Sequence, residues 1–140
     1  MKVGFAMLAI AGVAVAVPFG ASAAAGEERT CRGQLGAITV VNLRVPQNAT
    51  CVLVGTIVKG KLRVLRGATL KATRIHVVGD VQAENHRLVT VRSSQVGGSI
   101  QIVQGGGATA AGNTVKGDVQ LFENRRPIVL RNNRVDGNLQ

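Results

Sequence analysis

Residues 77–82 read Val77-Val78-Gly79-Asp80-Val81-Gln82, and this pattern of Val-x-Gly-x-aliphatic-Arg/Gln returns along most of the chain. Its glycine recurs at a nearly constant interval, at Gly60, Gly79, Gly98, Gly117 and Gly137. A degenerate copy, residues 39–45, lies one interval upstream of the first of these units. A unit this short cannot enclose a hydrophobic core alone and must stack on its neighbours. The repeat therefore predicts a solenoid.

Aliphatic residues take regular positions within each unit. We number each unit from its first valine, which is position 0. Positions 4 and 6 are also apolar. Because side chains alternate along a strand, we expect all three positions to point inward on one strand. Position 0 holds Thr39, Val58, Val77, Val96, Val115 and Val135. Position 4 holds Leu43, Leu62, Val81, Ile100, Val119 and Leu139. Position 6 holds Val45, Val64, Ala83, Ile102 and Leu121.

A second apolar set predicts a second strand in each unit, and Ile57 and Ile75 indicate a weaker third one. The second set, at positions 12 and 14, is Cys51 and Leu53, Leu70 and Ala72, Val89 and Val91, Ala108 and Ala110, then Val129 or Leu130. Residues that favour turns separate the strands. They are Asn48, Gly67, His86, Gly105 and Asn124 at one corner, and Gly55, Arg74, Ser93 and Gly112 at the next. We therefore predict an all-β, single-domain, triangular parallel β-solenoid with about five coils, each rising about 4.8 Å. A left-handed hexapeptide helix requires an aliphatic residue at every sixth position, which this pattern fits only in part, so we favour the right-handed form.

The N-terminus has the features of a secretory signal peptide. Lys2 precedes an apolar run over residues 3–17, and the small residues at 21–25 offer an Ala-x-Ala cleavage site. The run is shorter than a membrane span requires. We divide the chain into a signal peptide (1–23), an N-terminal capping segment (24–38) and a solenoid domain (39–140), and expect a secreted or periplasmic protein.

Cys31 and Cys51 are the only cysteines. Two cysteines in an exported protein predict one disulfide. The repeat places Cys31 almost directly above Cys51 in the preceding layer, at a spacing that suits such a bond. A two-cysteine metal site is the alternative, but no histidine or acidic cluster completes it. We predict no metal site.

The chain is strongly basic, with 17 Lys and Arg against 7 Asp and Glu. This excess favours anionic partners, such as lipopolysaccharide or another anionic envelope polymer, lipid head groups, or nucleic acid, although it can also serve solubility alone. The candidates for a polyanion site crowd the first full coil: Lys59, Lys61, Arg63, Arg66, Lys71 and Arg74. We expect Lys59, Lys61 and Arg63 to take alternate outward positions of one strand and so to share a face. Protection of exposed sheet edges is the alternative role.

No set of residues predicts catalysis. Asp80, Asp118 and Asp136 share the corner beside the repeat glycine, but Asp80 and Asp118 lie two coils apart, about 10 Å, too far to share a calcium ion. We interpret these acids as solvated surface. His76 and His86 fall at different positions of the coil with no nucleophile beside them, and we expect both at the surface. We predict no enzyme activity, no cofactor and no small-molecule substrate.

Position 5 forms an outward row that is basic and then amide-bearing. The row reads Arg44, Arg63, Gln82, Gln101, Gln120 and Gln140. Stacked glutamine amides on a parallel sheet hydrogen-bond one another along the stack. We favour this structural role over a binding role.

The recurring pattern Val-x-Gly-Asp-Val, as in 77–81 and 115–119, resembles that of the bactofilins, polymer-forming bacterial proteins with a right-handed triangular β-helix. The likeness covers residues 39–140. The chain is also similar to small secreted bacterial repeat proteins of no assigned activity, which share the signal peptide and the Ala-Thr-Cys segment seen at 49–51. Bactofilins are cytoplasmic and typically lack a cleaved signal and a disulfide. Because this chain differs in these features, the resemblance implies the fold of the bactofilins and not their cytoskeletal role.

Residues 135–140 read as the first strand of a further coil, with nothing after them to cover it. An uncovered end strand presents unpaired N–H and C=O groups. We expect this strand to dock on another subunit or to continue in a longer natural chain.

The leading hypothesis is a secreted, non-enzymatic solenoid with a structural or interaction role in the envelope or matrix, self-associating through this edge. A monomeric polyanion-binding module is the second hypothesis, and a carbohydrate-active β-helix enzyme the third.

Overall fold

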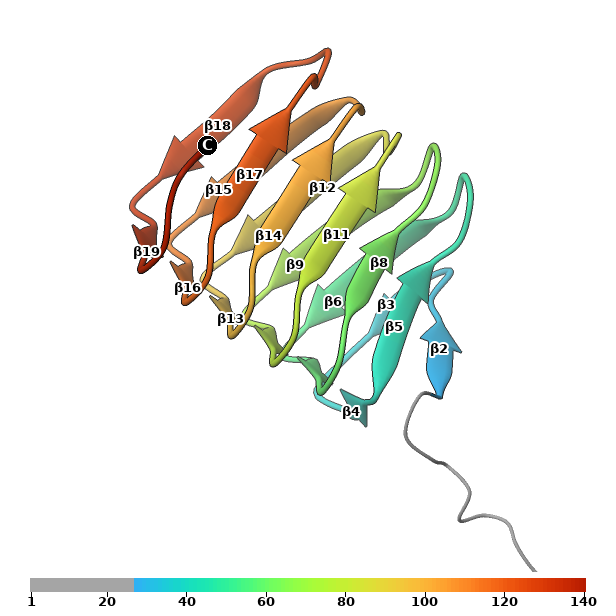
Figure 1. The fold of residues 1–140 in the computed structure, drawn as a ribbon. Helices are drawn as coiled ribbons and strands as arrows, with labels where there is room; N and C mark the ends of the chain where they lie inside the picture. The colour runs from blue at the N-terminus through green and yellow to red at the C-terminus, as the bar shows by residue number, and fades with distance from the viewer. Residues whose placement is uncertain (1–26) are drawn as a thin grey trace, which may run out of the picture.

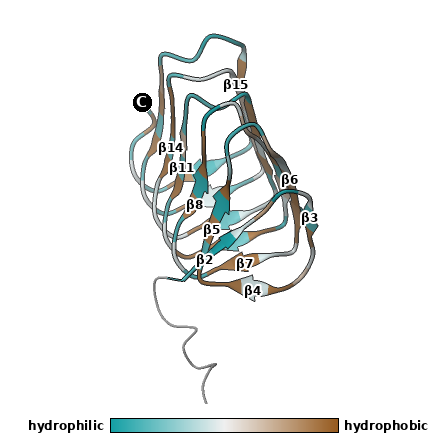
Figure 2. Cartoon of the chain, turned by 90° about the vertical axis from the view of Figure 1, so that its right-hand side faces the viewer, coloured by the Kyte–Doolittle hydropathy of each residue, from teal (hydrophilic) through white to brown (hydrophobic). Residues whose placement is uncertain are grey.

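The computed structural model describes residues 27–140, so the predicted signal peptide lies outside the described residues. Over this range the chain forms strands only, and each coil contributes one strand to each of three parallel six-stranded sheets. The coils wind as a right-handed, three-sided solenoid that advances from β2 towards β19 (Figure 1). Seen from its N-terminal side, successive coils stack behind one another (Figure 2). The predicted fold class is confirmed.

The three sheets are named here in the order in which the chain enters them. The first sheet contains β2 (Glu28–Thr30), β5 (Asn42–Val45), β8 (Leu62–Val64), β11 (Val81–Glu84), β14 (Ile100–Val103) and β17 (Val119–Phe122). The second sheet contains β3 (Gln34–Leu35), β6 (Thr50–Val54), β9 (Thr69–Thr73), β12 (Leu88–Arg92), β15 (Gly107–Ala111) and β18 (Ile128–Arg131). The third sheet contains β4 (Thr39–Val40), β7 (Ile57–Val58), β10 (His76–Val77), β13 (Gln95–Val96), β16 (Thr114–Val115) and β19 (Arg134–Val135).

The aliphatic residues stack in register to make the core. Val81 pairs with Leu62 on one side and with Ile100 on the other, and Ile100 pairs with Val119. Each of these residues is at most 4% exposed. The predicted inward stack at position 4 is therefore confirmed except at Leu139, which is 60% exposed. Because neighbouring coils repeat the same small side chains, each layer closes over the next without large aromatic residues.

Positions 0 and 4 do not lie on one strand, contrary to prediction. Val77 ends β10 in the third sheet, and Val81 begins β11 in the first sheet. The chain bends between them at the repeat glycine. A Cβ at Gly79 would approach the Gly60 carbonyl closer than the 3.0 Å that side chains tolerate. Glycine is needed here because the backbones of successive coils come close together.

The first unit is one residue shorter than the others at this bend. Val40, not Thr39, pairs with Val58, whereas Leu43 keeps its predicted pairing with Leu62. The assignment of Thr39 to position 0 was therefore wrong, and Thr39 is exposed. Counting one full repeat back from Val58 missed the deletion because the degenerate copy has no glycine to mark the bend.

The last unit is one residue longer than the others, and the extra residue lies before β18. The register of β18 differs in part from the prediction. Ile128 and Leu130 pair with Ala108 and Ala110, so they continue the inward row. Leu130 was one of the two predicted residues. Val129 points outward and is 39% exposed.

The corner between the second and third sheets matches the prediction. Gly55, Arg74, Ser93 and Gly112 all have positive φ, between 51° and 72°. The corner between the first and second sheets matches in its first two coils only, at Asn48 and Gly67. From the third coil on, the left-handed residue comes one place earlier, at Asn85, Gln104 and Glu123.

Candidate functional site

Cys31 and Cys51 form the predicted disulfide. The two sulfur atoms are 2.06 Å apart and the Cα atoms 5.6 Å apart. Cys31 directly follows β2 in the incomplete first layer, and Cys51 lies in β6 of the layer beneath it. Both cysteines are buried. The bond links the short N-terminal layer covalently to the first full coil. Neither cysteine therefore has a free thiol.

Two of the three acidic residues beside the repeat glycine, Asp80 and Asp118, are part of a side-chain ladder that joins successive coils. Asp80 Oδ1 accepts the backbone N–H of Ser99 at 2.8 Å, and Ser99 Oγ accepts that of Asp118 at 3.0 Å. Asp118 Oδ1 in turn accepts the N–H of Asn138 at 2.8 Å. The interpretation of Asp80 and Asp118 as solvated surface was therefore wrong. Each side chain folds over the glycine of the next coil and satisfies a backbone donor exposed by the bend.

A second ladder runs along the corner between the second and third sheets, and it is buried. Ser94 Oγ accepts the N–H of Ile75 at 3.1 Å, and Asn113 Oδ1 accepts that of Ser94 at 2.9 Å. Asn133 Oδ1 continues the ladder by accepting the N–H of Asn113 at 3.0 Å. This ladder was not predicted. Its signal in the sequence is the recurrence of a polar residue at this position of the unit, at Ser94, Asn113 and Asn133.

The outward glutamine row forms as predicted. Gln101 donates from Nε2 to Gln120 Oε1 at 2.9 Å and accepts from Gln82 at 3.4 Å. Gln120 donates to Gln140 at 3.2 Å. The amides therefore satisfy one another along the first sheet, which supports the structural role.

His86 is buried, with 2% of its surface exposed, so the expectation of a surface position was wrong. It turns inward because the left-handed residue of its corner is Asn85. His86 Nε2 lies 3.1 Å from the Gly107 carbonyl, to which it donates when that nitrogen carries the proton. Burial lowers the pKa of His86, and this backbone hydrogen bond opposes the shift in part. His76, in β10, is exposed as expected.

The candidate polyanion residues Lys59, Lys61 and Arg63 do not lie on one strand, contrary to prediction. Lys59 follows the end of β7, Lys61 lies in the bend, and Arg63 lies in β8. Because the chain bends at Gly60, the three side chains do not point in the same direction. Arg63 is also engaged, because its guanidinium lies 3.2 Å from the carboxylate of Glu28. The same carboxylate lies 3.8 Å from Arg44.

The other three candidates lie in or beside the second sheet. Lys71 points outward from β9 in the second sheet, and Arg66 and Arg74 lie in the corners on either side of that strand. All three are exposed. The six candidates therefore encircle one coil and do not form a single patch.

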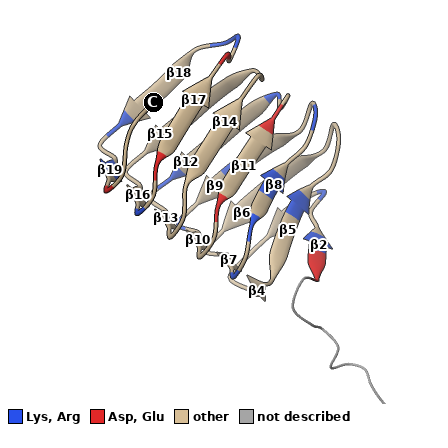
Figure 3. Ribbon diagram, in the orientation of Figure 1, with Lys and Arg blue, Asp and Glu red and all other residues tan. Residues whose placement is uncertain are grey.

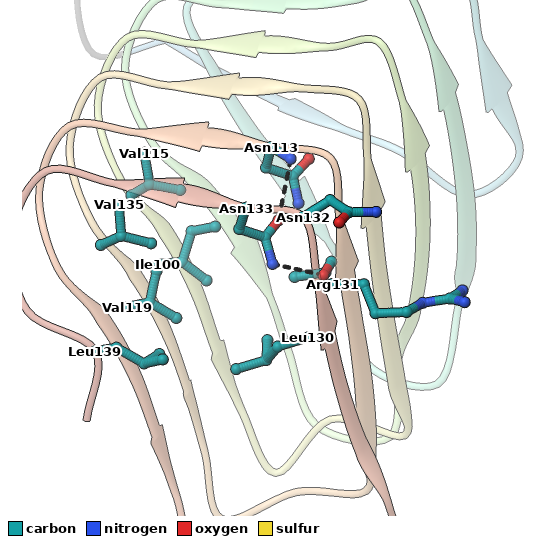
Figure 4. A pocket seen from close by; sticks show the side chains of 11 residues that line it. Ile100, Asn113, Val115, Val119, Leu130, Arg131, Asn132, Asn133, Val135 and Leu139 are labelled. Atoms are coloured by element: carbon teal, nitrogen blue, oxygen red, sulfur yellow. Dashed lines mark hydrogen bonds between the residues drawn. The ribbon is translucent and has the colours of Figure 1, made fainter.

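The C-terminal end of the core is open. Apolar side chains of the last two coils surround a hollow of about 220 Å³ (Figure 4). Its apolar lining comprises Ile100, Ala110, Val115, Val119, Leu130, Val135 and Leu139. Leu139 is 60% exposed, and its only ladder contact is a single bridge to Val119. At the opposite end, β2 and β3 form an additional layer over the core.

Residues 27–140 contain no group of three His, Cys, Asp or Glu side chains placed to hold a metal ion. The same part of the chain has no helix long and apolar enough to cross a membrane. Comparison with protein-family models, curated proteins and solved structures finds no match to this chain.

Proposed function

We propose that the protein is a secreted, non-enzymatic β-solenoid that acts as a structural or interaction element of the cell envelope or its matrix and self-associates through its C-terminal end. The observation that carries this proposal is the hollow that apolar residues of the last two coils line. Val77 and Val81, which are buried core residues of an earlier coil, have the half-buried Val135 and the exposed Leu139 as their counterparts in the last unit.

Unpaired backbone at the same end supports the proposal. Among residues 27–140, the outermost strands β17, β18 and β19 each have a neighbour on one side only, apart from the contacts of residues 138–140 with β17. Parallel strands with free N–H and C=O groups are ready templates for pairing with another chain. A second copy offers both the hydrogen bonds and the apolar surface that this end lacks.

The two ends of the solenoid differ, which favours tail-to-tail pairing over a head-to-tail filament. The N-terminal core is covered by the layer that carries Cys31, which is 2% exposed. Tail-to-tail pairing uses the same surface on both copies and closes as a dimer. The disulfide is compatible with an extracytoplasmic location.

Sedimentation of the purified protein at micromolar concentration tests the proposal. We expect a dimer that persists at high salt, because salt does not screen contacts between apolar surfaces. Leu139→Asp places a charge in the hollow and should shift the protein to monomer. Val129→Asp is the matched control, since Val129 is also exposed in the last coil but points outward from the second sheet. A wild-type protein that remains monomeric would refute the proposal.

A further inference from the structure

The strands of the second sheet contain Lys and Arg residues but no Asp or Glu (Figure 3). All seven acidic residues of the chain lie outside its six strands: Glu27, Glu28, Asp80, Glu84, Asp118, Glu123 and Asp136. Three basic residues point outward from this sheet and are exposed, namely Lys71 in β9, Arg92 in β12 and Arg131 in β18. Arg74 and Arg87, in the adjoining corners, are exposed as well.

None of these five cations is engaged by a carboxylate within residues 27–140. The salt bridges over that range involve Glu28 with Arg44 and Arg63, on the first sheet, and Arg134 with Asp136, at the third sheet. The first sheet therefore neutralises part of its own charge, whereas the second sheet leaves its charge available to a partner. The face is distinct from the bend that contains Lys59 and Lys61.

The strand register arranges the cations and hydroxyl groups in rows. Arg92 and Arg131 lie in one row with Ala111 between them, so they are two coils, about 10 Å, apart. In the neighbouring row Lys71 pairs with Thr90, which pairs with Thr109. Further threonines point outward from the earlier coils of the sheet: Thr50, Thr69 and Thr73. The outer face of this parallel sheet therefore carries cations and threonine hydroxyl groups, with aliphatic side chains such as Val129 among them.

We propose that this face binds a linear acidic polysaccharide. Lys71, Arg92 and Arg131 pair with carboxylates of the polymer, and the threonine hydroxyls hydrogen-bond its hydroxyl groups. An arginine guanidinium matches a carboxylate in shape and charge, and two such groups at a fixed spacing suit a polymer with repeated charges. The partner is identified by this combination of carboxylate and hydroxyl chemistry.

The composition of the face disfavours two other classes of polyanion. Its strands contain no aromatic residue, and single-stranded nucleic acids bind largely by stacking their bases on aromatic rings. Proteins that bind lipid surfaces commonly use tryptophan or tyrosine at the interface, and the chain has neither. The proposal does not depend on self-association, because Lys71 and Arg92 lie along the side of the solenoid and only Arg131 also borders the hollow.

Binding of the purified protein to polygalacturonate, with neutral dextran as the uncharged comparison, tests the inference. We expect affinity for polygalacturonate that falls steeply with salt, and no binding to dextran. The triple variant Lys71→Gln, Arg92→Gln, Arg131→Gln should lose about tenfold or more in affinity, since three charge contacts are removed. The triple variant Lys59→Gln, Lys61→Gln, Lys116→Gln removes the same charge from another part of the surface and should lose less than about threefold.

Equal losses in the two variants would overturn the assignment to the second sheet. Binding to phosphatidylglycerol vesicles or to DNA, without binding to polygalacturonate, would overturn the choice of partner. Carbodiimide coupling of polygalacturonate to the wild-type protein provides a readout that does not depend on the variants folding. Lys71 should be the lysine that couples preferentially, and preferential coupling at Lys59 or Lys61 would contradict the inference.

Discussion

At the scale of single residues, the ladder beside the repeat glycines has one interruption. Asn42 Oδ1 accepts the N–H of Lys61 at 2.9 Å, and Asp80 does the same for Ser99. Lys61 has no acceptor atom with which to continue the ladder to Asp80. Accordingly, the atoms nearest to a Cβ built on Gly79 all belong to the backbone of Gly60, whereas an aspartate oxygen is nearest at Gly98.

Lys61→Asn should repair this interruption. Its amide oxygen can accept the N–H of Asp80 and stabilise the protein by about 0.5–1.5 kcal/mol, the usual net value of one hydrogen bond. Urea denaturation measures the change. Lys59→Asn is the control, because it removes the same charge two residues away without reaching the ladder. A Lys61→Asn protein no more stable than the control would contradict the ladder mechanism.

The burial of His86 predicts that stability depends on pH. Its pKa is lowered in the folded protein from the ordinary value of 6.5, so the unfolded chain takes up a proton first as the pH falls. Stability should be fully retained above about pH 6.5 and should fall as the pH drops below it towards the folded-state pKa. Thermal melts across this range should show the loss, and His86→Asn should flatten it.

His76→Asn is the comparison for that experiment, because His76 is an exposed histidine in β10. It should leave the pH dependence in place. An unchanged slope in His86→Asn would show that other groups are responsible.

At the scale of the strand, neighbouring residues have opposite roles. Ile100 in β14 is 1% exposed and stacks between Val81 and Val119, whereas Gln101 points outward into the amide row. Ile100→Ala should destabilise the protein by about 2–5 kcal/mol, because it leaves a cavity in the middle of the stack. Gln101→Ala should cost at most about 1 kcal/mol. Chemical denaturation compares the two, and equal losses would mean that the register is shifted by one residue.

At the scale of the whole molecule, the disulfide decides how firmly the N-terminal layer covers the core. It closes a loop with a sequence separation of 20 residues, so its loss should cost about 3 kcal/mol. The double variant Cys31→Ala, Cys51→Ala should therefore unfold at lower denaturant concentration. Reductant should lower the stability of the wild type and leave that of the variant unchanged. Titration of two free thiols in the non-reduced, unfolded protein would contradict the bond.

Much of the solenoid was predictable because its main signals are periodic. The constant spacing of the repeat glycines sets the length of a coil, and alternation along each strand selects the buried residues, as Val81, Ile100 and Val119 illustrate. The same spacing brought Cys31 close to Cys51 and stacked the glutamines of the first sheet. These features depend only on which residues recur at a fixed interval.

Only the tertiary structure decided how each coil bends and what its polar side chains contact. The break between Val77 and Val81, the role of Asp80 and the burial of His86 all depend on backbone groups of the adjoining coil. Periodicity locates a residue within its own coil, but it does not show which backbone donor in the next coil lacks a partner. For the same reason, Lys59 and Arg63 were predicted to share a strand, while the three sheets direct them apart and leave Lys71, Arg92 and Arg131 together on one face.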